Sequence, residues 1–131
     1  MARMRLPGGD LEYAVLVKLW ELGAASAREI HAQVGEPAAL VYTTIAKVLD
    51  RLRDKGLVTR TRRGRAFRYR ARVARGAVDH ARARSVIGRL LGSRPHGALA
   101  ALVEAVESID PRLLDELEQA VAARRRSQRG A

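Results

Sequence analysis

Apolar residues in the first third of the chain recur at every third or fourth position, which is the period of an amphipathic helix. The pattern predicts a first helix that starts at Asp10, a suitable N-cap, and stops at Gly23. Its apolar face would consist of Leu11, Val15, Leu19 and Leu22. A capping-box sequence, SARE at 26–29, predicts a short second helix over about 27–34, ended by Gly35.

A third amphipathic helix is predicted from about Val41 to Lys55, with Gly56 as its C-terminal stop. Its apolar face would consist of Val41, Ile45, Val48, Leu49 and Leu52. The opposite face would carry Thr43, Lys47, Asp50 and Asp54, flanked by Thr44 and Arg51. Such a helix can pack on a core with one side and offer polar side chains to a partner with the other.

After Gly56 the hydrophobic period changes to the two-residue alternation that is typical of strands. Residues 57–62 and 66–72 alternate around a turn at 63–65, which predicts a hairpin. The core side of the second strand would consist of Phe67, Tyr69 and Ala71, and its outer side of Arg68, Arg70 and Arg72. Because a two-stranded hairpin is marginally stable alone, this one is expected to pack against the helices.

The C-terminal part of the chain returns to helical periodicity. Residues 77–91 are predicted to be helical, although Gly88 weakens the pattern, and residues 93–97 interrupt the chain. Two further helices follow, joined at Asp110 as N-cap with Pro111 in the first helical position. Their apolar stripes consist of Leu99, Leu102, Val103, Val106, Leu113, Leu114, Leu117 and Val121. Because so few helices cannot form a core alone, the stripes predict pairing with a second copy.

The order helix, capped helix, turn, helix and basic hairpin is that of a winged helix-turn-helix. The predicted fold class is mainly α (α+β), with a winged helix-turn-helix domain over 10–74, which has a two-stranded wing, and a helical dimerisation domain over 76–125. Residues 1–9 and 126–131 are predicted to be flexible tails. In this arrangement the third helix is free to lie in a major groove of DNA.

Composition narrows the class of protein further. The chain has 131 residues, of which 47% are hydrophobic and only five are aromatic, so its core must be mainly aliphatic. No segment reaches the ~20 apolar residues of a membrane span, and the N-terminus lacks the apolar region of a secretory signal. The absence of cysteine excludes disulfides and thiolate metal sites. We expect a cytoplasmic protein that does not act at a membrane and has no cofactor.

The net charge of +11 is unevenly distributed along the chain. The segment from Lys47 to Arg75 contains twelve Lys and Arg residues and two Asp residues, which gives it a net charge of +10. The segment from Leu99 to Gln119 contains six acidic residues and one basic residue, Arg112, which gives it a net charge of −5. A positive field confined to one part of a molecule indicates a polyanionic partner, and here we expect double-stranded DNA.

Several segments between Tyr42 and Tyr69, taken together, resemble the penicillinase-repressor family of BlaI/MecI/CopY-type regulators, and the resemblance extends over roughly residues 10–125. The shared pattern is a threonine pair before an apolar residue, then arginine-leucine, lysine-glycine and a Gly-Arg wing that ends in an aromatic residue. In this chain the pattern is carried by Tyr42–Ile45, Val48–Leu49, Arg51–Leu52, Lys55–Val58 and Gly64–Tyr69. Helix-turn-helix spacing alone would be a weak signal, but this succession of motifs is specific.

The resemblance implies a winged-helix domain, a helical dimerisation domain and repression through a palindromic operator. It also implies release from DNA, either by a regulatory protease or, in the copper branch, by metal at a cysteine cluster. The chain has no cysteine, which excludes the copper-thiolate switch, and Ala101–Leu102 replaces the Asn-Phe of the proteolysed members. Lys47 stands where relatives commonly have threonine, which would alter base preference. The inducing signal, whether a protease or another effector, is left open.

The candidate DNA contacts come from the third helix and the hairpin. Thr43, Thr44 and Lys47 can reach bases or phosphates, with ordinary helix surface as the alternative. Tyr42 suits either a phosphate contact or a packed turn. The candidate phosphate clamps are Arg51, Arg63, Arg65 and Arg68. In contrast, we expect Phe67 and Tyr69 to belong to the core and His31, His80 and His96 to be packing or surface residues.

Three other functions fit parts of the sequence. A non-specific architectural or RNA-associated protein would share the charge but would not need a capped three-helix scaffold. A small enzyme is disfavoured, because no clustered nucleophile, metal set or phosphate-binding loop is found. An adaptor whose wing binds an acidic protein is the third alternative.

Overall fold

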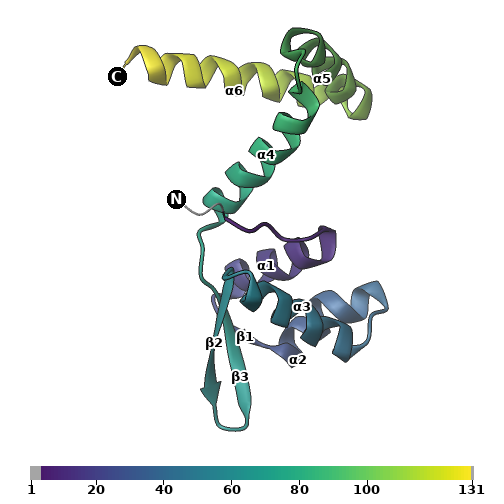
Figure 1. The fold of residues 1–131 in the computed structure, drawn as a ribbon, viewed down its shortest axis with the longest axis vertical. Helices are drawn as coiled ribbons and strands as arrows, with labels where there is room; N and C mark the ends of the chain where they lie inside the picture. The colour runs from purple at the N-terminus through teal and green to yellow at the C-terminus, as the bar shows by residue number, and fades with distance from the viewer. Residues whose placement is uncertain (1–3, 131) are drawn as a thin grey trace. The chain divides into compact units, whose positions relative to one another are not determined.

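The computed structural model describes residues 4–130, which form two compact units with their boundary between Arg84 and Ser85. The first unit contains three helices and a small sheet, followed by the start of a fourth helix (Figure 1). Its elements are α1 (Asp10–Leu22), β1 (Ala25–Ser26), α2 (Ala27–Ile30), η1 (His31–Gly35), η2 (Glu36–Ala38), α3 (Tyr42–Asp54), β2 (Val58–Arg63), β3 (Ala66–Ala71) and the first part of α4 (Arg75–Leu91). The mainly α winged helix-turn-helix is therefore confirmed.

The core of the first unit is aliphatic, as the composition predicts. The fully buried large side chains are Val15, Leu16, Leu19, Ile30, Ile45, Leu49, Leu52, Leu57 and Val78. All of the apolar positions predicted for the third helix are buried except Val41, which precedes the first turn of α3 and is 64% exposed. Burial of four side chains along one side of α3 fixes the opposite face of that helix in a defined orientation.

The start of α4 belongs to the first unit, although the sequence predicted a domain boundary near residue 75. Val78 is fully buried, and the hydroxyl group of Tyr13 donates a hydrogen bond to Asp79. The guanidinium group of Arg82 lies 3.5 Å from the centre of the Tyr13 ring. These contacts join α4 to α1, and the hydrophobic pattern of α4 alone does not reveal them.

The N-termini of α1 and α2 are stabilised in different ways. Asp10 is the first residue of α1 rather than its N-cap, because Gly9 occupies the capping position, and Asp10 complements the helix dipole from within the first turn. The predicted capping box of α2 is confirmed. The Glu29 amide donates to Ser26 Oγ at 3.2 Å, and the Ser26 amide lies 3.5 Å from Glu29 Oε1.

The turn between α2 and α3 differs from its prediction. Instead of continuing as an α-helix to residue 34, the chain forms a π-helical turn, η1, and a 3₁₀ turn, η2. Gly35 does not act as a left-handed stop, since its φ is −74°. It is buried, and a Cβ atom there would lie 2.5 Å from His31 Cδ2 and 2.9 Å from Ile45 Cγ1. Glycine is therefore required for close packing between the turn and α3.

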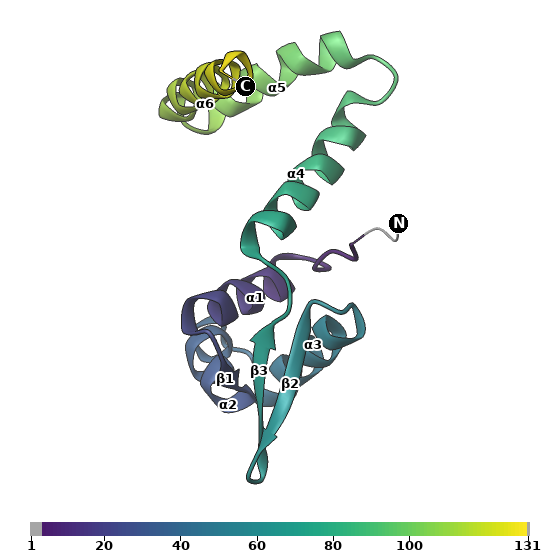
Figure 2. The same cartoon turned by 90° about the vertical axis from the view of Figure 1, so that its left-hand side faces the viewer.

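The sheet has three antiparallel strands in the order β1-β3-β2, where the sequence predicted two. Tyr69 of β3 pairs with Arg60 of β2 on one side and with Ala25 of β1 on the other. The two residues of β1 precede the capping box and use the free edge of β3, and so short a strand leaves no alternating pattern in the sequence. Figure 2 shows the hairpin of β2 and β3 projecting beyond the three helices of its unit.

The second unit contains the end of α4 and two helices that pack against each other, α5 (Pro95–Ile109) and α6 (Pro111–Arg129). Asp110 caps α6 as predicted, accepting a hydrogen bond from the Arg112 amide at 2.9 Å. α6 continues to Arg129, where a tail was predicted from residue 126, because Ala, Arg and Gln are good helix formers and arginines suit the last turn. Within residues 4–130, none of the helices has the length and apolar character to cross a membrane.

Candidate nucleic-acid interface

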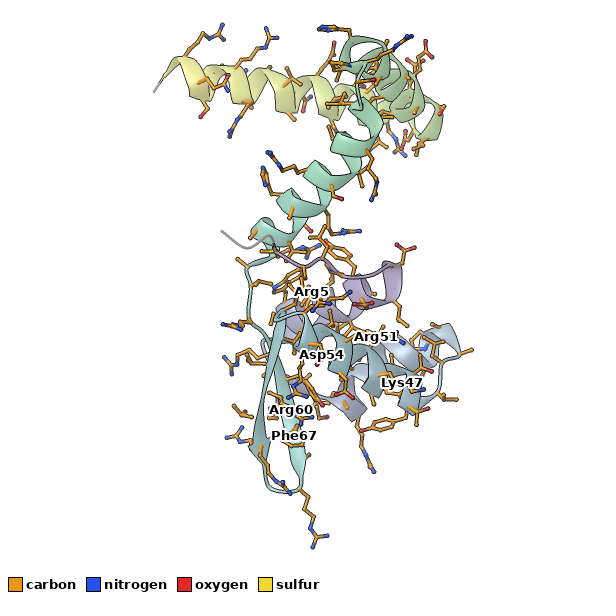
Figure 3. All side chains as sticks on the ribbon, viewed as in Figure 1. Arg5, Lys47, Arg51, Asp54, Arg60 and Phe67 are labelled. Atoms are coloured by element: carbon orange, nitrogen blue, oxygen red, sulfur yellow. The ribbon has the colours of Figure 1, made fainter. Side chains whose placement is uncertain are left out.

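The exposed face of α3 is the first part of the candidate interface. Thr43, Lys47 and Arg51 are exposed, while Thr44 is half-buried at the edge of the core. Figure 3 shows Lys47 and Arg51 on the same helix. Because they are four residues apart, their side chains lie on neighbouring positions of one helix surface. The structure thus brings three of the predicted α3 contacts onto one accessible surface.

The acidic residues of α3 lie towards its C-terminal end. Asp50 and Asp54 are exposed, and Asp50 Oδ1 is 3.8 Å from Arg53 Nη1 in a surface ion pair. Residues 42–49 contain Lys47 as their one charged side chain. The N-terminal half of α3 can therefore approach a phosphate backbone without repulsion from its own carboxylates.

The N-terminal end of α3 carries a tyrosine that is 44% exposed, Tyr42. Its ring packs edge-on against the imidazole of His31, with the ring centres 5.9 Å apart. His31 Nε2 is 2.8 Å from the carbonyl oxygen of Leu40, a hydrogen bond in which the imidazole donates and which closes the turn before α3. Tyr42 is therefore packed against His31 and still accessible to solvent, and His31 is a packing residue.

The turn of the hairpin exposes two of the predicted phosphate clamps, Arg63 and Arg65. Between them, Gly64 adopts φ of +62°, a left-handed conformation that favours glycine. The Nε–H group of Arg62 donates to the Gly64 carbonyl at 3.2 Å and thereby stiffens the turn. The tip of the wing thus presents two exposed guanidinium groups on a defined backbone.

Arg60 of β2 lies on the same side of the hairpin as two aromatic residues of β3. Strand register places it opposite Tyr69, on the same side of the sheet as Phe67. Its guanidinium carbon lies 3.8 Å from the centre of the Phe67 ring, and Nη1 is 3.5 Å from the Tyr69 hydroxyl group (Figure 3). Pairing the strands about Gly64 would have revealed this from the sequence, because residues opposite each other share a side.

Arg68 is held by contacts inside the first unit. Its Nη1 donates to Glu29 Oε1 at 3.1 Å, and its Nη2 donates to the carbonyl oxygen of Ala24 at 3.0 Å. The same Glu29 oxygen also accepts from the capping serine, Ser26. Arg68 therefore connects β3 to the start of α2, and so connects the wing to the helix-turn-helix.

A largely buried ion pair joins α1 to the end of α3. Lys55 Nζ donates to Glu12 Oε1 at 2.8 Å, and both side chains are largely buried. Burial raises the pKa of Glu12. The hydrogen bonds from Lys55 and from the Gly8 amide lower it, and so do the positive charges of Lys55 and Arg51. Together these four effects outweigh burial, so the pKa of Glu12 lies below its usual value. The ionised pair holds α3 against α1.

The predicted dimerisation residues lie on α5 and α6 and remain largely accessible. Leu99, Val103 and Leu113 are 47%, 42% and 37% exposed. The other predicted positions are half-buried, namely Leu102, Val106, Leu114 and Leu117. None of residues 85–130 is buried, so this unit has no closed core within the described chain.

Comparison with known proteins agrees with this architecture. The sequence profile of the penicillinase repressor family matches residues 8–123. The transcriptional regulator BlaI of Mycobacterium tuberculosis, in strains CDC 1551 / Oshkosh and ATCC 25618 / H37Rv, is 36% identical over 87% of this chain and 82% of its own length. The solution structure of the DNA-binding domain of the repressor BlaI superposes with a TM-score of 0.50 at 23% identity, over 56% of this chain and 90% of that domain. This chain belongs to the penicillinase repressor family.

Proposed function

We propose that the chain is a dimeric, sequence-specific DNA-binding transcriptional repressor that binds a pseudo-palindromic operator. One observation carries the proposal: a single folded unit combines an exposed helix face containing Lys47 and Arg51 with a hairpin whose turn exposes Arg63 and Arg65. Family membership supports the same function. The relatives from M. tuberculosis are named transcriptional regulators, and the similar solution structure is the DNA-binding domain of a repressor.

In the proposed complex, α3 lies in the major groove of DNA. Lys47 reaches base edges, for which lysine is a good partner of guanine O6 and N7, and Thr43 contacts bases or phosphate beside it. Thr44, at the edge of the core, contacts the backbone from the start of the helix. Arg51 lies one turn beyond Lys47 and binds phosphate with its planar fork of donors.

The wing holds the DNA backbone next to α3. Arg63 and Arg65 contact phosphates or the minor groove, and such contacts add affinity without reading sequence. For Arg68 we propose a supporting role in place of a phosphate contact, because Glu29 and Ala24 already occupy its guanidinium group. Arg68 would keep the wing at a fixed position relative to the helix-turn-helix.

Two copies pair through α5 and α6. Leucine and valine side chains that are 37–47% exposed on these helices form apolar stripes that a monomer would leave in water. A two-fold dimer would present two copies of α3, so the half-sites would be about one helical turn apart or a multiple of that. The operator is therefore expected to be a pseudo-palindrome.

Selection from a pool of random DNA duplexes tests the proposal. The full chain should enrich a two-fold symmetric consensus and should retain that duplex in excess random DNA. Sedimentation of the free protein at micromolar concentration should give a dimer. A charge of +11 alone would also fit a non-specific architectural or RNA-associated protein. Enrichment of no consensus, together with equal affinity for all duplexes, would establish that alternative and refute the repressor.

A further inference from the structure

A depression at the helix-turn-helix turn adjoins the N-terminal end of α3, beyond the face formed by Thr43, Lys47 and Arg51. It has a volume of about 480 Å³, is open to solvent, and is lined by Arg28, His31, Glu36 and Tyr42. Arg28 comes from α2 and Tyr42 is the first residue of α3, so the depression joins the two helices of the motif. All four lining residues are polar or aromatic, which favours a charged, solvated occupant over an apolar one.

We propose that this depression is a seat for a DNA backbone phosphate, bound by the guanidinium group of Arg28 and the hydroxyl group of Tyr42. The proposal rests on the proposed DNA-binding function. It adds Arg28 to the predicted DNA contacts, and it assigns Tyr42, for which the sequence allowed a phosphate contact or a packed turn, to the phosphate. When a helix-turn-helix docks, its first helix crosses the DNA backbone while the second enters the groove. The place where α2 meets the start of α3 then faces the phosphates beside that groove.

The position of Arg28 is not explained by the stability of the fold. Its side chain is exposed and takes part in no ion pair among the described residues 4–130. It is the second helical residue of α2, after the N-cap Ser26 and the first helical residue Ala27. A positive charge at this end of a helix is repelled by the helix dipole. An arginine at such a site becomes favourable when a bound anion supplies the opposite charge.

The base of the depression is rigid. The hydrogen bond from His31 to the Leu40 carbonyl, 2.8 Å long, fixes the imidazole, and the Tyr42 ring packs edge-on against it. These contacts leave Tyr42 with its ring packed and 44% of the residue exposed. A hydroxyl group on a fixed ring binds phosphate with little loss of side-chain entropy.

Glu36 gives the proposal a second, opposite test. Its carboxylate lines the same depression, with Oε1 4.0 Å from His31 Nδ1, and it is 65% exposed. A carboxylate beside a bound phosphate repels it. Neutralising Glu36 should therefore strengthen DNA binding, whereas neutralising Arg28 should weaken it, although both residues are surface charges that line one depression.

The experiment compares variants of the full chain by fluorescence anisotropy with a labelled selected duplex and a labelled random duplex, over a series of salt concentrations. Arg28→Gln should reduce the slope of log affinity against log salt by about 0.9 and weaken binding roughly eightfold at about 0.1 M salt, because one phosphate contact is lost. Tyr42→Phe should weaken binding about threefold, as expected for one lost hydrogen bond. Glu36→Gln should tighten binding about twofold to threefold. The base preference of all three should remain that of the wild type.

Two matched variants control for total charge. Arg84→Gln removes an exposed arginine from α4, at the end of the same unit, and Glu21→Gln removes an exposed carboxylate from α1. Both should leave the salt slope unchanged. If Arg28→Gln matches Arg84→Gln, or if Glu36→Gln weakens binding, the phosphate seat is refuted. Failure of the wild type to discriminate between the two duplexes would instead refute the sequence-specific repressor, so the two failures can be told apart.

Discussion

Gly35→Ala tests whether the α2–α3 turn positions the recognition helix through close packing. The new Cβ atom would lie 2.5 Å from His31 Cδ2 and 2.9 Å from Ile45 Cγ1, both below the 3.0 Å that real Cβ atoms keep. Overpacking a core typically costs about 1–3 kcal/mol, and two such contacts favour the upper half of this range. Alanine also lowers the conformational entropy of the unfolded chain, which stabilises the folded state by about 0.4–1 kcal/mol and offsets part of this loss. The expected net loss is about 1–2.6 kcal/mol.

For a unit of this size, each kcal/mol lowers Tm by about 4–8 °C. Trp20 is the one tryptophan of the chain and packs against the core of the first unit, so its fluorescence reports the unfolding of that unit. Gly76→Ala is the control, since Gly76 lies in α4 of the same unit and a Cβ there meets nothing within 4 Å. It should leave Tm unchanged or raise it. A Gly35→Ala variant as stable as the wild type would refute the packing argument.

Three further predictions concern the Glu12 ion pair, the contacts of Arg68 and the second unit. Since the pKa of Glu12 is lowered in the folded state, its stabilising effect is complete above the unfolded value of 4.5 and is lost as pH falls through the folded value. Trp20 fluorescence in denaturant should therefore show a smaller loss of stability below pH 4.5 for Glu12→Gln than for the wild type; equal losses would contradict the assignment. Arg68→Lys removes the two-pronged contact with Glu29 and Ala24 and should lower operator affinity by roughly tenfold or less, with an unchanged salt slope in anisotropy titrations. A slope reduced by about 0.9 would instead make Arg68 a phosphate contact. Val103→Asp should convert the dimer to a monomer in sedimentation while the circular dichroism of the helices persists, and a persisting dimer would place the interface elsewhere.

Elements with strong local signals were predicted well from the sequence. The predicted third helix, 41–55, differs from α3 by one residue at each end, because four apolar residues at helical spacing and a following glycine define it. The hairpin and the cap at Asp110 were equally clear, since turn and capping chemistry depend on adjacent residues. Family-specific motifs then related these elements to DNA binding.

Features that depend on contacts between distant residues were not predicted. The docking of α4 rests on Tyr13 with Asp79 and on Trp20, whose Nε1 donates to the Val73 carbonyl at 2.8 Å. The role of Arg68 depends on Glu29, which lies 39 residues earlier in the chain. A pattern of alternating arginines shows which side of a strand each occupies but not which of them already has a partner.

The most direct test of the central claim compares Lys47→Ala with Arg65→Ala on a panel of duplexes that differ from the selected operator at single base pairs. Lys47→Ala should change the order of preference among the duplexes, by up to about 1–3 kcal/mol at the base pair it contacts. Arg65→Ala should weaken binding to all of them equally and flatten the salt dependence. If Lys47→Ala leaves both affinity and preference as in the wild type, α3 does not read the operator and the account is contradicted.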